Sequence, residues 1–132
     1  SLGVPVWGFQ TDVFPAFYTR SSGLKLEHSF QSTDALARAL AAHALTSPRC
    51  GSVIANPIPA EFALDEAEEH TLIENAMQAA HKEGISGKET TPFVLGHLHR
   101  ASEGRTVEAN LALVENNTQL AARIAVAMAS FA

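Results

Sequence analysis

The chain has 132 residues, of which 46% are hydrophobic and 17% are charged, and its formal net charge is −5. This is the composition of one globular domain and not of a disordered segment, and the acidic excess argues against electrostatic binding to nucleic acid. No apolar run reaches the roughly 18 residues of a membrane-spanning helix. The single cysteine, Cys50, excludes an internal disulfide and fits a reducing compartment, so we expect a cytoplasmic protein.

The beginning of the chain is unusual for a natural N-terminus. It opens at Ser1, without a methionine or a signal peptide, and almost at once reaches the apolar segment 4–9. Natural N-termini usually place polar residues before the first core strand. We therefore expect residues 1–132 to be one portion of a longer chain.

Three short segments have the pattern of buried or half-buried strands. Residues 4–9 are β-branched and aromatic, residues 24–30 alternate apolar and polar side chains, and residues 50–55 are mostly small and apolar. The prolines of Asn56-Pro57-Ile58-Pro59 end the third segment abruptly.

Four helices are expected between and after these strands. The first begins at Ser32-Thr33-Asp34 and ends at Ser47-Pro48, and the second runs from about 65 to 83 with Gly84 as its cap. After a polar loop at 87–91, Thr91 and Pro92 read as the N-cap and first residue of a third helix that ends near Gly104. The last helix covers about 106–130.

Strands and helices in this order predict an α/β fold. Two or three strands covered by about four helices are one part of a layered α/β domain. Three strands make a poor sheet alone, so we expect further strands in an upstream segment.

Two polar clusters have simple structural explanations. His97 and His99 are two residues apart, so on a helix their side chains point about 200° away from each other and cannot chelate one metal ion. Thr19, Ser21 and Ser22 beside Arg20 could cradle a phosphate, but the commoner explanation is a polar loop, because no strand, glycine loop and helix accompany them.

The segment that contains Lys88 has two possible interpretations, an anion-binding site or a purely structural loop. Residues 87–93 place charged and hydrogen-bonding groups directly before a helix N-terminus, which favours anions. The other reading is a capped helix with a salt-bridged loop. The residues alone do not choose between them.

Asn110, Asn116 and Asn117 fall in one expected helix, although asparagine is a weak helix former. They either cover an exposed face or direct a carboxamide into a pocket. A carboxamide has one acceptor and two donors on a planar end, which matches an imide edge such as that of uracil. Both readings stay open.

Taken together, five segments resemble the pseudouridine-5′-phosphate glycosidase family, also called indigoidine-synthase-A-like. The resemblance extends from Leu2 to about Ala127, and residues 94–104 depart from the usual family pattern. The segments are Gly3-Val4-Pro5-Val6-x-Gly8-x-x-Thr11, Phe14-Pro15-Ala16-Phe17-Tyr18-x-Arg20-x-Ser22, Val53-x-Ala55-Asn56-Pro57-Ile58-Pro59, Gly84-Ile85-x-Gly87-Lys88-Glu89-x-Thr91-Pro92-Phe93 and Asn110-x-x-Leu113-Val114-x-Asn116-Asn117.

The resemblance implies an enzyme that reversibly cleaves the C–C glycosidic bond of pseudouridine 5′-phosphate to uracil and ribose 5-phosphate. It implies a manganese-dependent homotrimer in which a lysine forms a Schiff base with the opened ribose, a glutamate acts as acid and base, and an aspartate holds the metal. A C–C bond has no good leaving group, so the imine supplies the electron sink.

By the same resemblance, these catalytic and metal-binding residues precede Ser1, and the chain is the C-terminal portion of a single glycosidase domain that is inactive alone. Lys88 is then not the Schiff-base lysine. Asn110 matches a base-contacting asparagine, while Asn56, Lys88 and Thr91 lie in family motifs and are weaker candidates for substrate binding.

An alternative of another class remains. A chain of domain size could be a stand-alone, non-catalytic binding or interaction module of the same fold. Such a module is expected to be a folded monomer without an exposed apolar patch.

Overall fold

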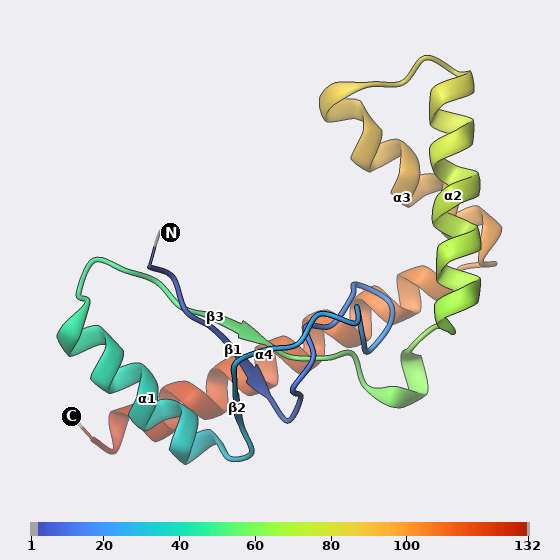
Figure 1. Ribbon diagram of the computed structural model, residues 1–132. Helices are drawn as coiled ribbons and strands as arrows, with labels where there is room; N and C mark the ends of the chain where they lie inside the picture. The colour runs from blue at the N-terminus through green and yellow to red at the C-terminus, as the bar shows by residue number, and fades with distance from the viewer. Residues whose placement is uncertain (1–2, 132) are drawn as a thin grey trace.

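The computed structural model describes residues 3–131, so Ser1, Leu2 and Ala132, with the expected opening of the chain, lie outside the described residues. Figure 1 shows the elements along the chain. They are β1 (Val6–Phe9), β2 (His28–Phe30), α1 (Thr33–Thr46), β3 (Val53–Ala55), the 3₁₀ turn η1 (Ala60–Phe62), α2 (Glu66–Lys82), the 3₁₀ turn η2 (Gly87–Glu89), α3 (Thr90–Ala101) and α4 (Arg105–Ala129).

A three-stranded parallel sheet in the order β2-β1-β3 confirms the α/β class. Each strand is shorter than the pattern predicted, and the difference is largest for the second, which was expected over 24–30 and is only β2. Lys25 instead forms an isolated antiparallel bridge with Val13. The segment before β2 is therefore part of the long connection over residues 10–27 between β1 and β2, which we call the β1–β2 excursion.

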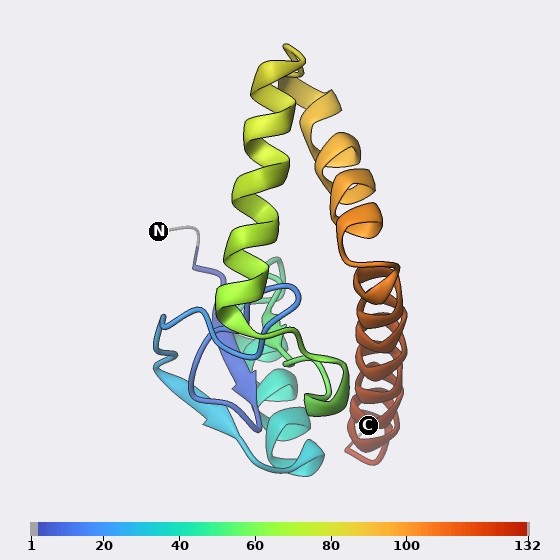
Figure 2. The same ribbon diagram turned by 90° about the vertical axis from the view of Figure 1, so that its right-hand side faces the viewer.

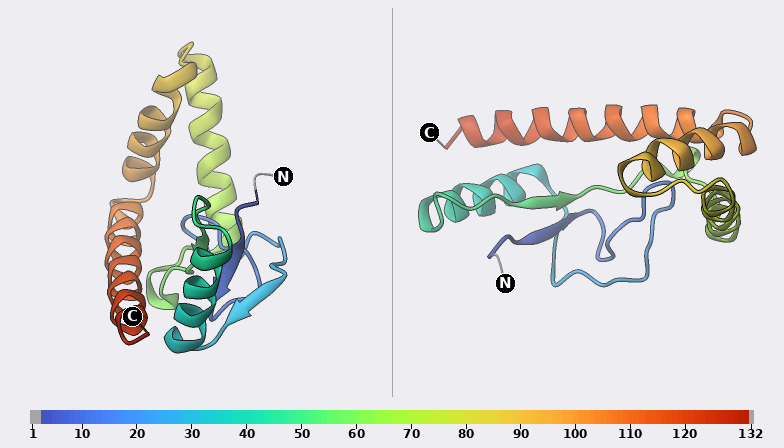
Figure 3. Two further views of the ribbon diagram at one scale, coloured as in Figure 1. Left: turned by 90° about the vertical axis from the view of Figure 1, so that its left-hand side faces the viewer. Right: turned by 90° about the horizontal axis from the view of Figure 1, so that it is seen from above.

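Helices α1 and α4 lie side by side against one face of this sheet (Figures 2 and 3). Phe9, Leu36 and Leu120 are the buried centre of the core between them. Further side chains from the three strands and both helices pack around these three: Trp7, Phe30, Leu40, Ile54 and Ile124.

The opposite face of the sheet is covered at Gly8 by the segment around Thr11 and Leu26, but it exposes apolar side chains at the other end. Side chains alternate between the faces of a strand, so Val6 and its register partner Val53 point away from the core, and both are exposed. Parallel sheets in proteins are normally covered on both faces. This face therefore has the character of an internal surface.

Helices α2 and α3 form a hairpin that projects away from the sheet (Figures 1 and 2). Of the four helices expected to cover the strands, only α1 and α4 do so. The base of the hairpin closes a second core with the β1–β2 excursion and α4, which includes Tyr18, Ile58, Leu64, Leu98 and Ala109. None of the helices within residues 3–131 is long and apolar enough to cross a membrane.

The helix starts confirm two predicted caps and correct a third. Ser32 caps α1 by accepting from the backbone N–H of Ala35, and Asp65 caps α2 by accepting from Ala67 and Glu68. The prediction that Thr91 is an N-cap was wrong. The expected polar loop contains η2, which runs directly into α3, so α3 already begins at Thr90.

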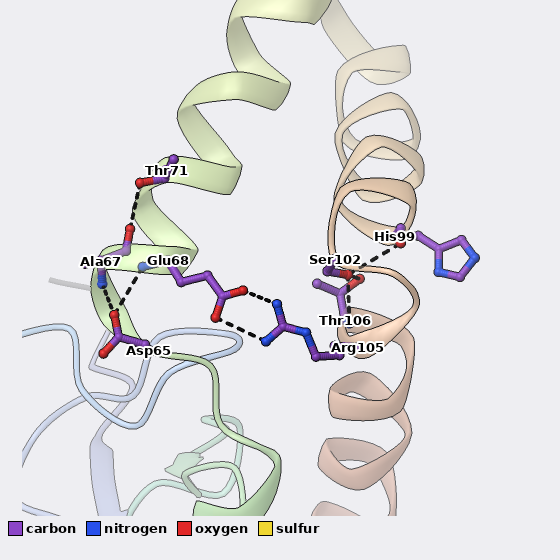
Figure 4. Close-up of polar contacts among 8 residues, drawn as sticks. All are labelled: Asp65, Ala67, Glu68, Thr71, His99, Ser102, Arg105 and Thr106. Carbon is purple, nitrogen blue, oxygen red and sulfur yellow. Dashed lines mark hydrogen bonds and ion pairs between the residues drawn. The ribbon is translucent and has the colours of Figure 1, made fainter.

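An ion pair ties the base of the hairpin to α4 (Figure 4). The guanidinium of Arg105, in the first turn of α4, donates to both carboxylate oxygens of Glu68 in the first turn of α2. That hydrogen-bonded guanidinium holds the pKa of Glu68 below its ordinary value of 4.5. Beside it, the Ser102 hydroxyl donates to Thr106 over 3.1 Å, where the chain passes from α3 into α4.

This pair predicts a pH-dependent contribution to stability. A carboxyl whose pKa is lowered by folding stabilises the fold above its unfolded pKa and loses that contribution as the pH falls through the folded value. Glu68→Gln should therefore lower the Tm slightly at pH 7, and its difference from the wild type should shrink as the pH falls below 4.5.

Thermal unfolding followed by circular dichroism across this pH range measures the difference. Glu66→Gln is the matched control, because Glu66 is an acid in the same first turn of α2 and is not the partner of Arg105. A difference for Glu68→Gln that does not change with pH, or that the control reproduces, contradicts the prediction.

Candidate functional site

An apolar groove with two carboxamides lies between α4 and the excursion after β1. Its volume is about 470 Å³. Phe14, Pro15, Ala16 and Phe17 form one wall, and Asn110, Leu113, Val114 and Asn117 form the other. The four positions of α4 are spaced by three and four residues, so they share one face of the helix. The groove therefore contains Asn110, the main substrate-binding candidate from the sequence.

The turn after β3 is joined to α4 by two hydrogen bonds that asparagine side chains donate. The side-chain N–H of Asn56 donates to the carbonyl oxygen of Asn117 over 3.0 Å, and that of Asn116 donates to the backbone carbonyl of Pro57 over 3.1 Å. The structure thus brings Asn56 and Asn110 to one region through Asn117. It also gives Asn116 a role in holding α4 to the turn after β3.

The opposite wall is fixed from behind by the buried carboxylate of Glu69 on α2. This carboxylate accepts from the backbone N–H of Tyr18 and from the hydroxyl of Thr19, each over 3.1 Å. The backbone carbonyl of Tyr18 accepts from Leu64 over 2.8 Å. These contacts hold the chain directly after Phe17, which places the aromatic wall opposite α4.

Tyr18 supports the same wall as a buried, uncharged phenol. Burial raises its pKa above the ordinary 10.0, the hydrogen bond to Thr106 lowers it, and the nearby Glu69 carboxylate raises it. The neighbouring ring of Phe17 meets Tyr18 edge to face, with 4.6 Å between ring centroids. Because the phenol stays protonated near neutral pH, it serves packing and hydrogen bonding here.

The groove is suited to a flat ring with a polar edge. Phe17 is 54% and Val114 is 58% exposed, so the walls present apolar surface to solvent. Such walls favour the faces of a planar ring, while a carboxamide can pair with its edge. Asn110 lines this groove, and its pairing with an imide edge stays a prediction.

Lys88 and Thr91 lie elsewhere. The segment from η2 into α3 is at the tip of the α2–α3 hairpin, away from the α4 groove (Figures 1 and 2). Both residues are exposed there. Within one copy of the chain, the structure does not bring them together with Asn56 and Asn110.

The two histidines of α3 are also apart from the groove. His97 stacks on Phe93, and the ring of His99 points away from the Ser102–Thr106 contact (Figure 4). Across residues 3–131, no group of three His, Cys, Asp or Glu side chains could hold a metal ion.

Sequence reasoning identified Asn110 but missed the role of Glu69 and the pairing of Asn56 with Asn117. The helical spacing of 110, 113, 114 and 117 was a usable signal for one wall. The hydroxyls of Thr19 and Ser22 bond to Glu69 and to the carbonyl of Phe14, which supports the reading of this segment as a structured polar loop.

Comparison with known proteins gives consistent matches over almost the whole chain. Residues 1–127 match the family described as indigoidine synthase A like protein. The pseudouridine-5′-phosphate glycosidase of Alkaliphilus metalliredigens is 46% identical over 96% of this chain and 41% of its own length. That of Staphylococcus aureus is 44% identical with the same coverage.

Two solved structures share the fold. A prealnumycin C-glycosynthase in complex with ribulose 5-phosphate has a TM-score of 0.89 and 29% identity, covering 98% of this chain and 42% of the other. An indigoidine synthase A-like protein of Thermotoga maritima has a TM-score of 0.79 and 32% identity, covering 93% and 40%.

The chain spans about two fifths of the length of these relatives. The chain belongs to the indigoidine synthase A-like family.

The hydrogen bonds from Tyr18 and Thr19 to Glu69, which we call the Glu69 clamp, give a stability prediction. Glu69→Ala leaves the buried N–H of Tyr18 and the Thr19 hydroxyl without their acceptor, so it should lower the free energy of unfolding by about 1–3 kcal/mol. Urea unfolding followed by circular dichroism measures this value. Glu66→Ala, an exposed neighbour on α2, should change it by less than about 0.5 kcal/mol. Equal effects of the two substitutions would refute the clamp.

Proposed function

We propose that the chain is the C-terminal portion of a pseudouridine-5′-phosphate glycosidase, a cytoplasmic enzyme that reversibly splits a C–C glycosidic bond to give uracil and ribose 5-phosphate. The named relatives are such glycosidases, and the chain covers 41% of their length. In this proposal, residues 1–132 complete a pocket whose reacting groups lie upstream in the same domain.

The observation that carries the proposal is the groove that contains Asn110. Its aromatic and aliphatic walls suit the two faces of a pyrimidine, and the Asn110 carboxamide suits the N–H and C=O of its edge. Asn117, on the same helix face, already accepts from Asn56, so Asn110 is the groove amide assigned to the base. Lys88 and Thr91 remain weaker candidates for substrate binding. We propose that the protein is a homotrimer, in which the hairpin tip that carries them reaches the groove of a neighbouring copy.

The covalent chemistry is assigned to groups outside this chain. The Schiff-base lysine, the acid–base glutamate and the aspartate for manganese are proposed to lie upstream. The described residues 3–131 do not fit a manganese site, because they contain no cluster of three metal-ligating side chains. This chain's own contribution is to bind and orient the base.

Exposed apolar faces support an upstream layer and count against a stand-alone module. Val107, Leu111 and Val114 follow one another at helical spacing along α4 and are 45%, 66% and 58% exposed. The sheet face with Val6 and Val53 is exposed as well. A stand-alone module was expected to lack such patches, whereas the remaining part of a longer domain, or further copies in a trimer, would cover them.

The role of Asn110 leads to a binding prediction. In the full-length protein, Asn110→Ala should weaken pyrimidine binding by about 1–3 kcal/mol, because the polar edge of the base loses its partner. Calorimetric titration with uracil alone, without ribose 5-phosphate so that no glycosidic bond can form, measures the change.

Gln119→Ala is the matched control for this experiment. Gln119 is also a carboxamide on α4, but it pairs with Glu115 and lies outside the groove. Its truncation should leave uracil affinity unchanged. An Asn110→Ala variant that binds uracil as tightly as the wild type would sink the assigned role.

A further inference from the structure

A second, smaller cavity lies at the carboxyl ends of two adjacent parallel strands. Its volume is about 190 Å³. Phe9 and Gln10 line it from the end of β1, Asn56 and Pro57 line it from the end of β3, and Arg123 approaches from α4. In open α/β sheets, ligands bind in the crevice outside the carboxyl ends of the strands. The position is therefore that of a ligand site.

The charge of this cavity is unlike that of the chain. Two of its lining residues are arginines, Arg20 and Arg123, and none is acidic, although the chain as a whole carries a net charge of −5. The ion pairs found within residues 3–131 do not involve either arginine. Asp34 borders a neighbouring hollow that Arg123 also lines, but it is not part of this cavity.

Both guanidinium groups are held in place and keep donors to spare. Arg20 donates one N–H to the backbone carbonyl of Ile58, and Arg123 lies over the ring of Phe9, 5.9 Å from its centroid. A guanidinium has five N–H donors in a rigid fork that matches carboxylate and phosphate oxygens. The amide N–H groups of Asn56 and Asn116 are used within the protein, so the arginines are the main donors toward a ligand.

From this geometry we propose that the cavity between Arg20 and Arg123 is a binding site for a phosphate group. The two arginines supply charge-assisted hydrogen bonds to its oxygens. This cavity is distinct from the base groove, although Asn56, which lines it, bonds to Asn117 of that groove. The inference of a phosphate site rests on the two arginines, and only its assignment to a sugar phosphate rests on the proposed function. The phosphate can belong to a sugar phosphate or be free inorganic phosphate, since both present the same oxygens.

The test is a calorimetric titration of the full-length protein with inorganic phosphate and, separately, with ribose 5-phosphate, at constant ionic strength set with chloride. Arg123→Gln is the informative variant, because Arg20 also supports the backbone at Ile58. Removing one charged donor should weaken phosphate binding by at least about tenfold.

Arg38→Gln is the matched control. Arg38 likewise lies over an aromatic ring, that of Phe131, but it does not line the cavity. It should leave phosphate affinity unchanged and confirm that the loss in Arg123→Gln is not a general charge effect. Thermal unfolding of both variants checks that the fold is retained.

The two titrations separate the sources of the phosphate. Tighter binding of ribose 5-phosphate than of inorganic phosphate, with both weakened by Arg123→Gln, supports a sugar phosphate as the ligand. Weakening of inorganic phosphate alone supports the free anion. Absence of phosphate binding to the wild type, or equal affinity in the wild type and Arg123→Gln, overturns the proposal.

Discussion

Helix α4 packs into both cores and also lines the groove and the smaller cavity. The rest of the structure depends on which of its residues face each of these. Leu120 enters the core beneath the sheet, while Ala109 enters the second core at the base of the hairpin. Small residues such as Ala109 let neighbouring elements approach the helix closely. The same rotation that buries these residues turns Asn110 toward the groove and Arg123 toward the cavity at the strand ends. A helix fixed by two cores can therefore present polar groups at defined places.

The second constraint concerns the loop between β1 and β2 that faces α4. Its conformation is fixed by a contact from another helix and not only by hydrogen bonds within the loop. The carboxylate of Glu69 reaches the excursion after β1 from another helix and fixes the chain at Tyr18 and Thr19. Because the buried carboxylate fixes the backbone of this loop, its aromatic side chains can stay exposed to solvent. The hairpin thus contributes to the groove from its base, while its tip stays remote.

Local chemistry decided which parts of this fold could be predicted. The helix starts at Ser32 and Asp65 followed from capping, which involves neighbours in sequence. The start at Thr91 could not be found this way, because the turn of η2 continues into α3. Asn110 was identifiable from residue type and resemblance. The sequence offered Arg20 only as part of a possible phosphate-binding loop, because its meeting with Arg123 at one cavity depends on packing between distant segments.

The central claim is that this chain completes an active site whose reacting groups lie upstream. The most direct measurement is uracil release from pseudouridine 5′-phosphate with manganese, by the 132-residue chain alone and by the full-length protein. Circular dichroism should first establish that the isolated chain is helical. The account predicts release by the full-length protein and none by the chain alone. Release by the isolated chain, or no release by the full-length protein, would contradict it.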